Sequence, residues 1–77
     1  DPETTEGLAK PYYEKVADVL LAKNEPRYNS ALIECYSYLG YYYLLKSDYA
    51  ASKEYWNKIL AIDPTNATAN KALDGIK

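Results

Sequence analysis

The sequence predicts an all-α fold of about four antiparallel helices, and three observations carry this prediction. Residues 28–45 form a continuous stretch in which Glu34 is the only charge. Amphipathic runs at helical spacing lie on both sides of that stretch. Short polar breaks separate the runs at 24–27, 46–48 and 63–66, as expected between helices. With 77 residues, the chain has room for one small domain, 1–77, with a limited core.

The first predicted helix extends from about residue 8 or 11 to residue 23. Asp1-Pro2-Glu3 can start a helical turn of its own, because proline suits a first helical position and acidic groups suit the positive helix end. Gly7 and Pro11 then interrupt the chain. The polar residues Glu14 and Asp18 are expected to face solvent. The opposite stripe is expected to hold Ala9, Tyr13, Val16, Leu20 and Lys23.

The central predicted helix covers residues 28–46. Leu39, Gly40 and Tyr43 follow Tyr36 at offsets of three, four and seven, so the four residues line one side of the helix. A glycine within a helix costs about 1 kcal/mol relative to alanine. Gly40 therefore predicts the close approach of another backbone.

The third predicted helix begins after Asp48, a plausible N-cap, and ends at Asp63-Pro64. Its core side is expected to contain Trp56, Ile59 and Leu60. Glu54 and Lys58 form an i,i+4 pair that marks the solvent side.

The last predicted helix spans residues 66–76, with Thr65 or Asn66 as its cap. Asn66-Ala67-Thr68 also fits an N-glycosylation sequon, and capping explains Asn66 without it. The helix has a thin apolar stripe and one polar face, as a terminal capping helix requires. This stripe consists of Ala69, Leu73 and Ile76.

Large, small and turn residues follow a fixed order across the two central helices. They are Tyr36, Leu39-Gly40, Tyr43, Tyr49, Ser52, Trp56 and Pro64. Over 33–66 this order resembles one tetratricopeptide repeat, a helix-turn-helix unit of about 34 residues. Two departures, Ser52 in place of alanine and Ile59 in place of a small residue, predict a slightly wider fit between the helices.

The resemblance implies a solenoid fragment made of stacked helix-turn-helix units. In this interpretation 8–23 is the second helix of a partial repeat, 28–62 is the repeat hairpin, and 66–76 is the C-terminal cap. The chain begins at Asp1 and contains no methionine, so we expect a fragment of a longer protein.

The residue inventory favours a non-catalytic protein. There is no histidine and only one cysteine, so histidine-based acid-base catalysis is excluded and no metal site or cofactor is expected. Cys35 follows Glu34, which disfavours a reactive thiolate, and is interpreted as a small buried residue. Glu14 and Asp18, at i,i+4 spacing, are interpreted as solvated charge rather than as a catalytic pair.

Charge and length narrow the class of partner. The formal net charge is −2 and no basic run occurs, so nucleic-acid binding is not expected. No apolar stretch has the length of a membrane span. The class of partner that the resemblance implies is a protein or a peptide.

In the resembling family, the first helix of each repeat lines a concave groove that holds peptide or protein partners. Carried onto this chain, that groove predicts a partner-binding face made of Glu34, Ser37, Tyr38, Tyr41 and Leu45. The alternative, open for Tyr38 and Tyr42, is that these rings pack on other helices of the same chain. Family members that grip a terminal carboxylate use Lys, Arg and Asn on this face, so a carboxylate clamp is disfavoured here.

Two other functions remain open at this point. One is structural self-association into a homo-oligomer. The other is a regulatory or targeting role within a larger enzyme.

Overall fold

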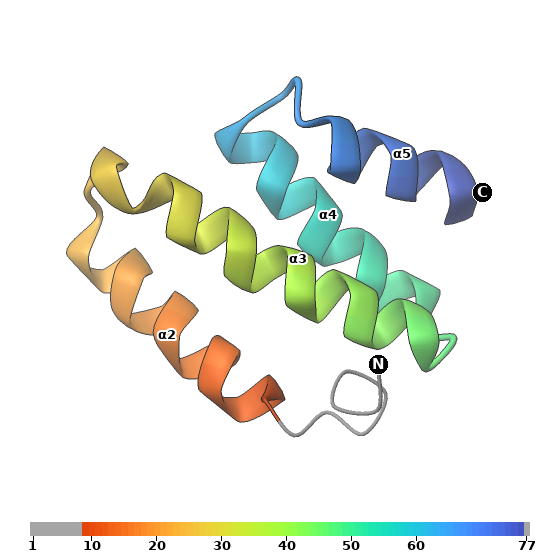
Figure 1. Cartoon of the computed structure of the whole chain (residues 1–77), viewed down its shortest axis with the longest axis horizontal. Helices are drawn as coiled ribbons and strands as arrows, with labels where there is room; N and C mark the ends of the chain where they lie inside the picture. The colour runs from red at the N-terminus through yellow and green to blue at the C-terminus, as the bar shows by residue number, and fades with distance from the viewer. Residues whose placement is uncertain (1–8, 77) are drawn as a thin grey trace.

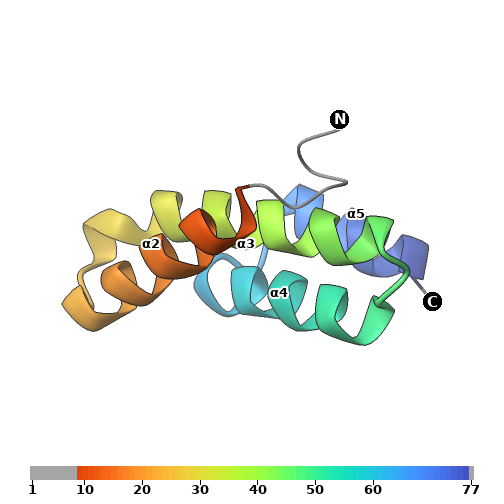
Figure 2. The ribbon, with the colours of Figure 1, turned by 90° about the horizontal axis from the view of Figure 1, so that it is seen from below.

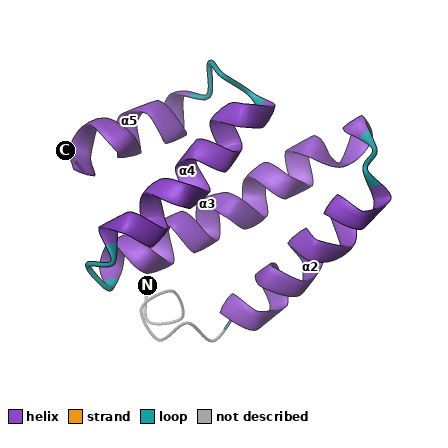
Figure 3. Ribbon diagram, turned by 180° about the vertical axis from the view of Figure 1, so that it is seen from behind, coloured by secondary structure: helices purple, strands orange, loops and turns teal. Residues whose placement is uncertain are grey.

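The computed structural model describes residues 9–76, and these residues form four α-helices and one short 3-10 turn (Figures 1 and 3). The all-α prediction is therefore confirmed. The turn expected at Asp1-Pro2-Glu3 lies outside the described residues. The elements are α2 (Lys10–Lys23), η1 (Pro26–Tyr28), α3 (Asn29–Leu45), α4 (Tyr49–Ile62) and α5 (Ala67–Ile76).

Helix α3 is the centre of the arrangement. It packs most extensively against α4, with which it forms an antiparallel hairpin, and then against α2 on its other side. Helix α5 packs on α4 (Figure 1). The result is a flat body of 32 × 28 × 18 Å, in which α3 and α4 lie in two layers (Figure 2). Because α3 has neighbours on two sides, the apolar residues along its length can pack against other helices.

The helix ends follow from local hydrogen bonds. The Asp48 carboxylate accepts a hydrogen bond from the backbone N–H three residues later, at 3.3 Å, and caps α4 as predicted. The Asn66 amide oxygen does the same for α5 at 2.9 Å, so Asn66 rather than Thr65 is the cap. Helix α2 ends at Lys23 and is capped by Asn24, whose φ of 51° is left-handed. Pro26 starts the 3-10 turn, and α3 begins after it at Asn29.

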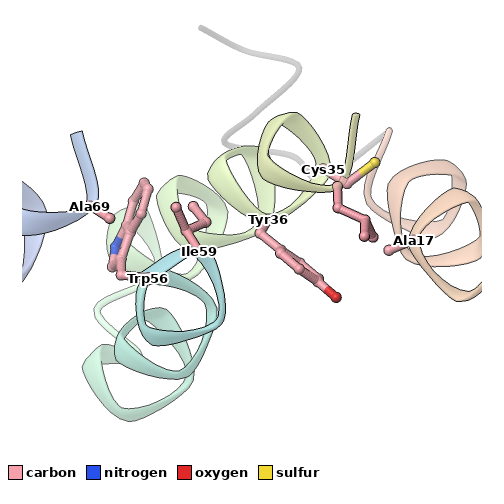
Figure 4. Packing of buried hydrophobic residues seen from close by; sticks show 7 residues of the cluster. Ala17, Cys35, Tyr36, Trp56, Ile59 and Ala69 are labelled. Carbon is pink, nitrogen blue, oxygen red and sulfur yellow. The ribbon is translucent and has the colours of Figure 1, made fainter. Parts of the chain in front are cut away.

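The buried core lies on both sides of α3 (Figure 4). Leu32 and Cys35 are buried on α3, and Cys35 lies on the side toward Ala17, the one buried residue of α2 (Figure 4). The predicted α2 stripe omitted Ala17, and Lys23, which that stripe included, is exposed. The other part of the core is at α4 and α5, and it contains Trp56, Ile59 and Ala69.

The close neighbour of Gly40 is an indole ring rather than another backbone. A Cβ atom at Gly40 would lie 2.6 Å from Cε2 of Trp56, so the predicted close approach exists but the neighbour was wrong. Ser52 is fully buried beside the indole. Its hydroxyl accepts a hydrogen bond from Nε1 of Trp56 at 3.0 Å and donates one to the Gly40 carbonyl oxygen at 2.8 Å. The serine that departs from the repeat pattern is thus the partner of the buried indole N–H.

Replacing Ser52 with alanine, the residue usual in the resembled repeat, should lower the free energy of unfolding by about 1.5 kcal/mol. The indole N–H of Trp56 would remain buried without an acceptor. Urea unfolding followed by circular dichroism measures the loss. In a Trp56→Phe background the donor is absent, so the same Ser52→Ala change should cost less. Equal costs in the two backgrounds would show that this hydrogen bond is not the cause.

Candidate functional site

The five residues of the predicted partner-binding face lie on the side of α3 away from Tyr36. We call them the outer face of α3. Glu34, Tyr41 and Leu45 are exposed, Tyr41 by 44% and Leu45 by 54%. Ser37 and Tyr38 are half-buried. The outer face therefore combines an accessible part with a part that packs inside the molecule.

Tyr41 is held in place by the core beneath it. Its ring meets the Trp56 ring edge-on, with centroids 4.9 Å apart and planes at 81°. Because Trp56 is fully buried, it provides a fixed support. Tyr41 is thus packed against a fixed ring and still 44% exposed, as a preorganised contact residue requires.

Tyr38 belongs more to the contact between α2 and α3. Its ring stacks on Tyr13 with centroids 4.4 Å apart. Its hydroxyl is buried and has no hydrogen-bond partner among residues 9–76. For Tyr38 the structure therefore favours packing within the chain, the alternative that the sequence left open. The accessible outer face is reduced to Glu34, Tyr41 and Leu45, with Ser37 at its edge.

Tyr42 lies among lysines and another tyrosine. Its ring meets Tyr43 edge-on at 5.0 Å. The ammonium groups of Lys10 and Lys46 lie 5.7 and 5.8 Å from its centroid, within the range of cation–π attraction. Tyr42 is half-buried, so it too has neighbours within the chain.

A cleft of about 320 Å³ lies between α2 and α4, beneath α3. We call it the α2–α4 cleft. Tyr36 and Leu39 of α3 form its floor. Glu14, Ala17, Asp18 and Leu21 line the α2 side, and Tyr55 and Lys58 line the α4 side.

The sequence did not indicate this cleft. Glu14 and Asp18 were expected to be simply solvated, and Lys58 to pair with Glu54. Instead, Glu14 accepts from Lys10 at 3.1 Å. Lys58 places its ammonium group 5.8 Å from the Tyr36 centroid, and residues 9–76 contain no ion pair between Lys58 and Glu54. The pair is favourable on an isolated helix, but a ring on a neighbouring helix offers the lysine another contact.

Burial raises the pKa of two phenols of the cleft further above neutral pH. It raises the pKa of Tyr36, with smaller contributions from Cys35 and Asp18. It also raises the pKa of Tyr55, where Tyr43 adds to the effect. Both side chains are therefore neutral near pH 7, and each hydroxyl can donate or accept a hydrogen bond.

Cys35 is a buried thiol on the α2 side of α3, as expected. Burial raises its pKa, and Glu34 adds to this effect. The thiol form therefore dominates near pH 7.

Two further observations concern residues 9–76 only. They contain no group of three or more acidic or cysteine side chains that could hold a metal ion. None of their helices is long and apolar enough to cross a membrane. Comparisons with protein-family models, with curated proteins and with solved structures give no match.

Proposed function

We propose that this chain is a non-catalytic interaction module, built like a tetratricopeptide repeat, that binds a peptide or protein partner on the outer face of α3. The observation that carries the proposal is the exposure of Tyr41 and Leu45. They are four residues apart on one helix and therefore lie one above the other on the same face. Large accessible apolar side chains at adjacent positions are typical of recognition surfaces.

The fixed position of Tyr41 supports this proposal. A ring already supported by Trp56 loses little conformational freedom on binding, which reduces the entropic cost of association. Glu34 is the only charged residue of the outer face. The favoured ligand is therefore a peptide with apolar side chains spaced to contact Tyr41 and Leu45.

Replacing Leu45 with lysine should weaken such binding by about tenfold or more, the range of an anchor residue in an interface. A displayed library of random peptides, selected on the wild-type chain, supplies the ligands. Their affinities are then measured by titration against wild type and variant. Leu45 is exposed and ends α3, where a positive charge is favourable, so the fold should be retained.

Val19→Lys is the matched control. Val19 is 47% exposed on α2, and the same substitution there should leave the affinity of the selected peptides unchanged. Peptides that bind wild type and Leu45→Lys equally would contradict the proposed site. Circular dichroism spectra of both variants establish that the helices are intact.

Self-association is the second candidate function, and one observation favours it. Helix α2 carries its own set of exposed apolar side chains, Tyr12, Val19 and Leu21, which are 64%, 47% and 50% exposed. Light scattering or sedimentation over a wide concentration range measures the mass of the chain. A dimer that Val19→Lys dissociates and Leu45→Lys does not would assign self-association to α2.

A further inference from the structure

We propose that the α2–α4 cleft is a second binding site, on the opposite side of α3 from the outer face, and that its ligand is an arginine side chain of a partner polypeptide. The proposal does not depend on a ligand at the outer face. It follows from an aromatic floor, an acidic wall and the position of one lysine.

The floor of the cleft offers aromatic rings and a phenol hydroxyl. Tyr36 is 4% exposed, and its ring extends from α3 into the space between α2 and α4, with the oxygen farthest from α3 (Figure 4). This hydroxyl lines the cleft and has no hydrogen-bond partner among residues 9–76. The centroid of the Tyr55 ring lies 6.0 Å from the centroid of the Tyr36 ring, and the two planes are tilted by 40°. A planar cation can contact these rings and donate a hydrogen bond to the phenol oxygen.

The α2 wall carries the carboxylates. Glu14 is already paired with Lys10. Asp18 forms no ion pair within the described part of the chain, and it lies on the exposed rim of the cleft. A carboxylate next to aromatic rings can accept two parallel N–H bonds from a guanidinium group.

The chain already places a cation of its own in this setting. The Lys58 ammonium lies over the Tyr36 ring, on the side of the cleft opposite Asp18. This contact places a positive group within cation–π range of the ring from the α4 side. A ligand cation would compete with Lys58 for the same ring.

Size and shape select arginine among cationic ligands. About 320 Å³ is at the lower end of ligand-pocket volumes, which suits one side chain rather than a large molecule. A guanidinium group is planar, stacks on aromatic faces and binds carboxylates with two bonds, whereas an ammonium group is a compact, strongly hydrated point charge. The cleft offers both a ring and a carboxylate, so arginine uses it more fully than lysine.

The test is a titration of the whole chain with three blocked tripeptides, followed by NMR chemical shifts. Acetyl-Gly-Arg-Gly-amide should bind, acetyl-Gly-Lys-Gly-amide should bind more weakly, and the citrulline analogue should not bind measurably. Citrulline keeps the shape of arginine and removes its charge. The largest shifts should be at Ala17, Leu21 and Leu39, which line the cleft. Binding should weaken as salt is added.

Three variants test the named contacts. Asp18→Asn should weaken binding of the arginine peptide by about tenfold, since a charge-assisted pair is lost. Tyr36→Phe keeps the ring and removes the hydroxyl, and should weaken binding by about threefold. Lys58→Met should strengthen binding, because the competing cation is gone. Glu54→Gln, an exposed acid outside the cleft, is the matched control and should have no effect.

Equal binding of the arginine and citrulline peptides would overturn the proposal, and so would equal binding by wild type and Asp18→Asn. Shifts centred on Tyr41 and Leu45 instead of Ala17 and Leu21 would assign the cation to the outer face and remove the second site. Because the outer face is tested with apolar peptides and Leu45→Lys, failure at one site is distinguishable from failure at the other.

Discussion

Replacing Trp56 with alanine should lower the free energy of unfolding by about 4 kcal/mol. A chain of 77 residues has a total stability of roughly 4 to 12 kcal/mol, so the substitution should remove between about a third and all of it. Far-UV circular dichroism with a urea titration measures the change, relative to wild type under the same conditions.

The expected loss of unfolding free energy is large because several elements meet at the Trp56 indole. Trp56 has no exposed surface. It comes from α4, approaches the bare backbone of α3 at Gly40, supports the Tyr41 ring and hydrogen-bonds to Ser52. Ala69 of α5 lies beside it (Figure 4). Alanine would leave a cavity between three helices, and the neighbouring backbones cannot close it without moving apart from their other contacts.

Tyr49→Ala is the matched control for this prediction. Tyr49 is an aromatic residue of the same helix and is 49% exposed, so its removal should change the free energy of unfolding by about 0.5 kcal/mol or less. A Trp56→Ala variant with the urea midpoint of wild type would show that the contact between the three helices does not depend on the indole.

Gly40→Ala should destabilise the chain by about 2 kcal/mol, although alanine is the better helix former. The helix propensity of alanine favours the variant by about 1 kcal/mol. Against this, the new Cβ would lie 2.6 and 2.7 Å from two carbons of the Trp56 ring. The ring is rigid and fully buried, so overpacking should cost about 3 kcal/mol. This cost exceeds the gain in helix propensity, so the net change should be destabilising. Urea unfolding measures the net change.

The same substitution at Gly75 should have the opposite sign. A Cβ there meets no atom within 4 Å, and Gly75 lies inside α5. Gly75→Ala should therefore stabilise the chain by roughly 0.5 to 1 kcal/mol. If both alanine variants were stabilised, helix propensity alone would govern Gly40 and the contact with the indole would not be tight.

The helices and their ends could be predicted from the sequence because local physics determines them. Asp48 stands before an apolar run and caps it, and Asp63-Pro64 follows the last helical turn of α4. Spacing on one helix also identified Trp56 and Ile59 as core residues. These features depend on residues close together in the chain, and a single sequence contains that information directly.

What could not be predicted depends on pairs of residues that are distant in sequence. Gly40 indicated a close neighbour, but its identity as Trp56 requires the relative rotation of α3 and α4. The position of Lys58 over Tyr36 requires the same knowledge. The α2–α4 cleft depends further on how far α2 lies from α4, and no periodicity within one helix fixes that distance. The role of Tyr38 was open for the same reason, since its partner Tyr13 is on another helix.

The two-sided core has a consequence for partial unfolding. Helix α2 packs chiefly on α3, whereas Trp56, Ile59 and Ala69 lie on the other side of α3. Detaching α2 would uncover Cys35 while leaving the contacts of the indole in place, so this step requires less free energy than global unfolding. The single thiol is thus a built-in reporter of a subglobal opening, because it is closed to solvent in the native state and would be uncovered when α2 detaches.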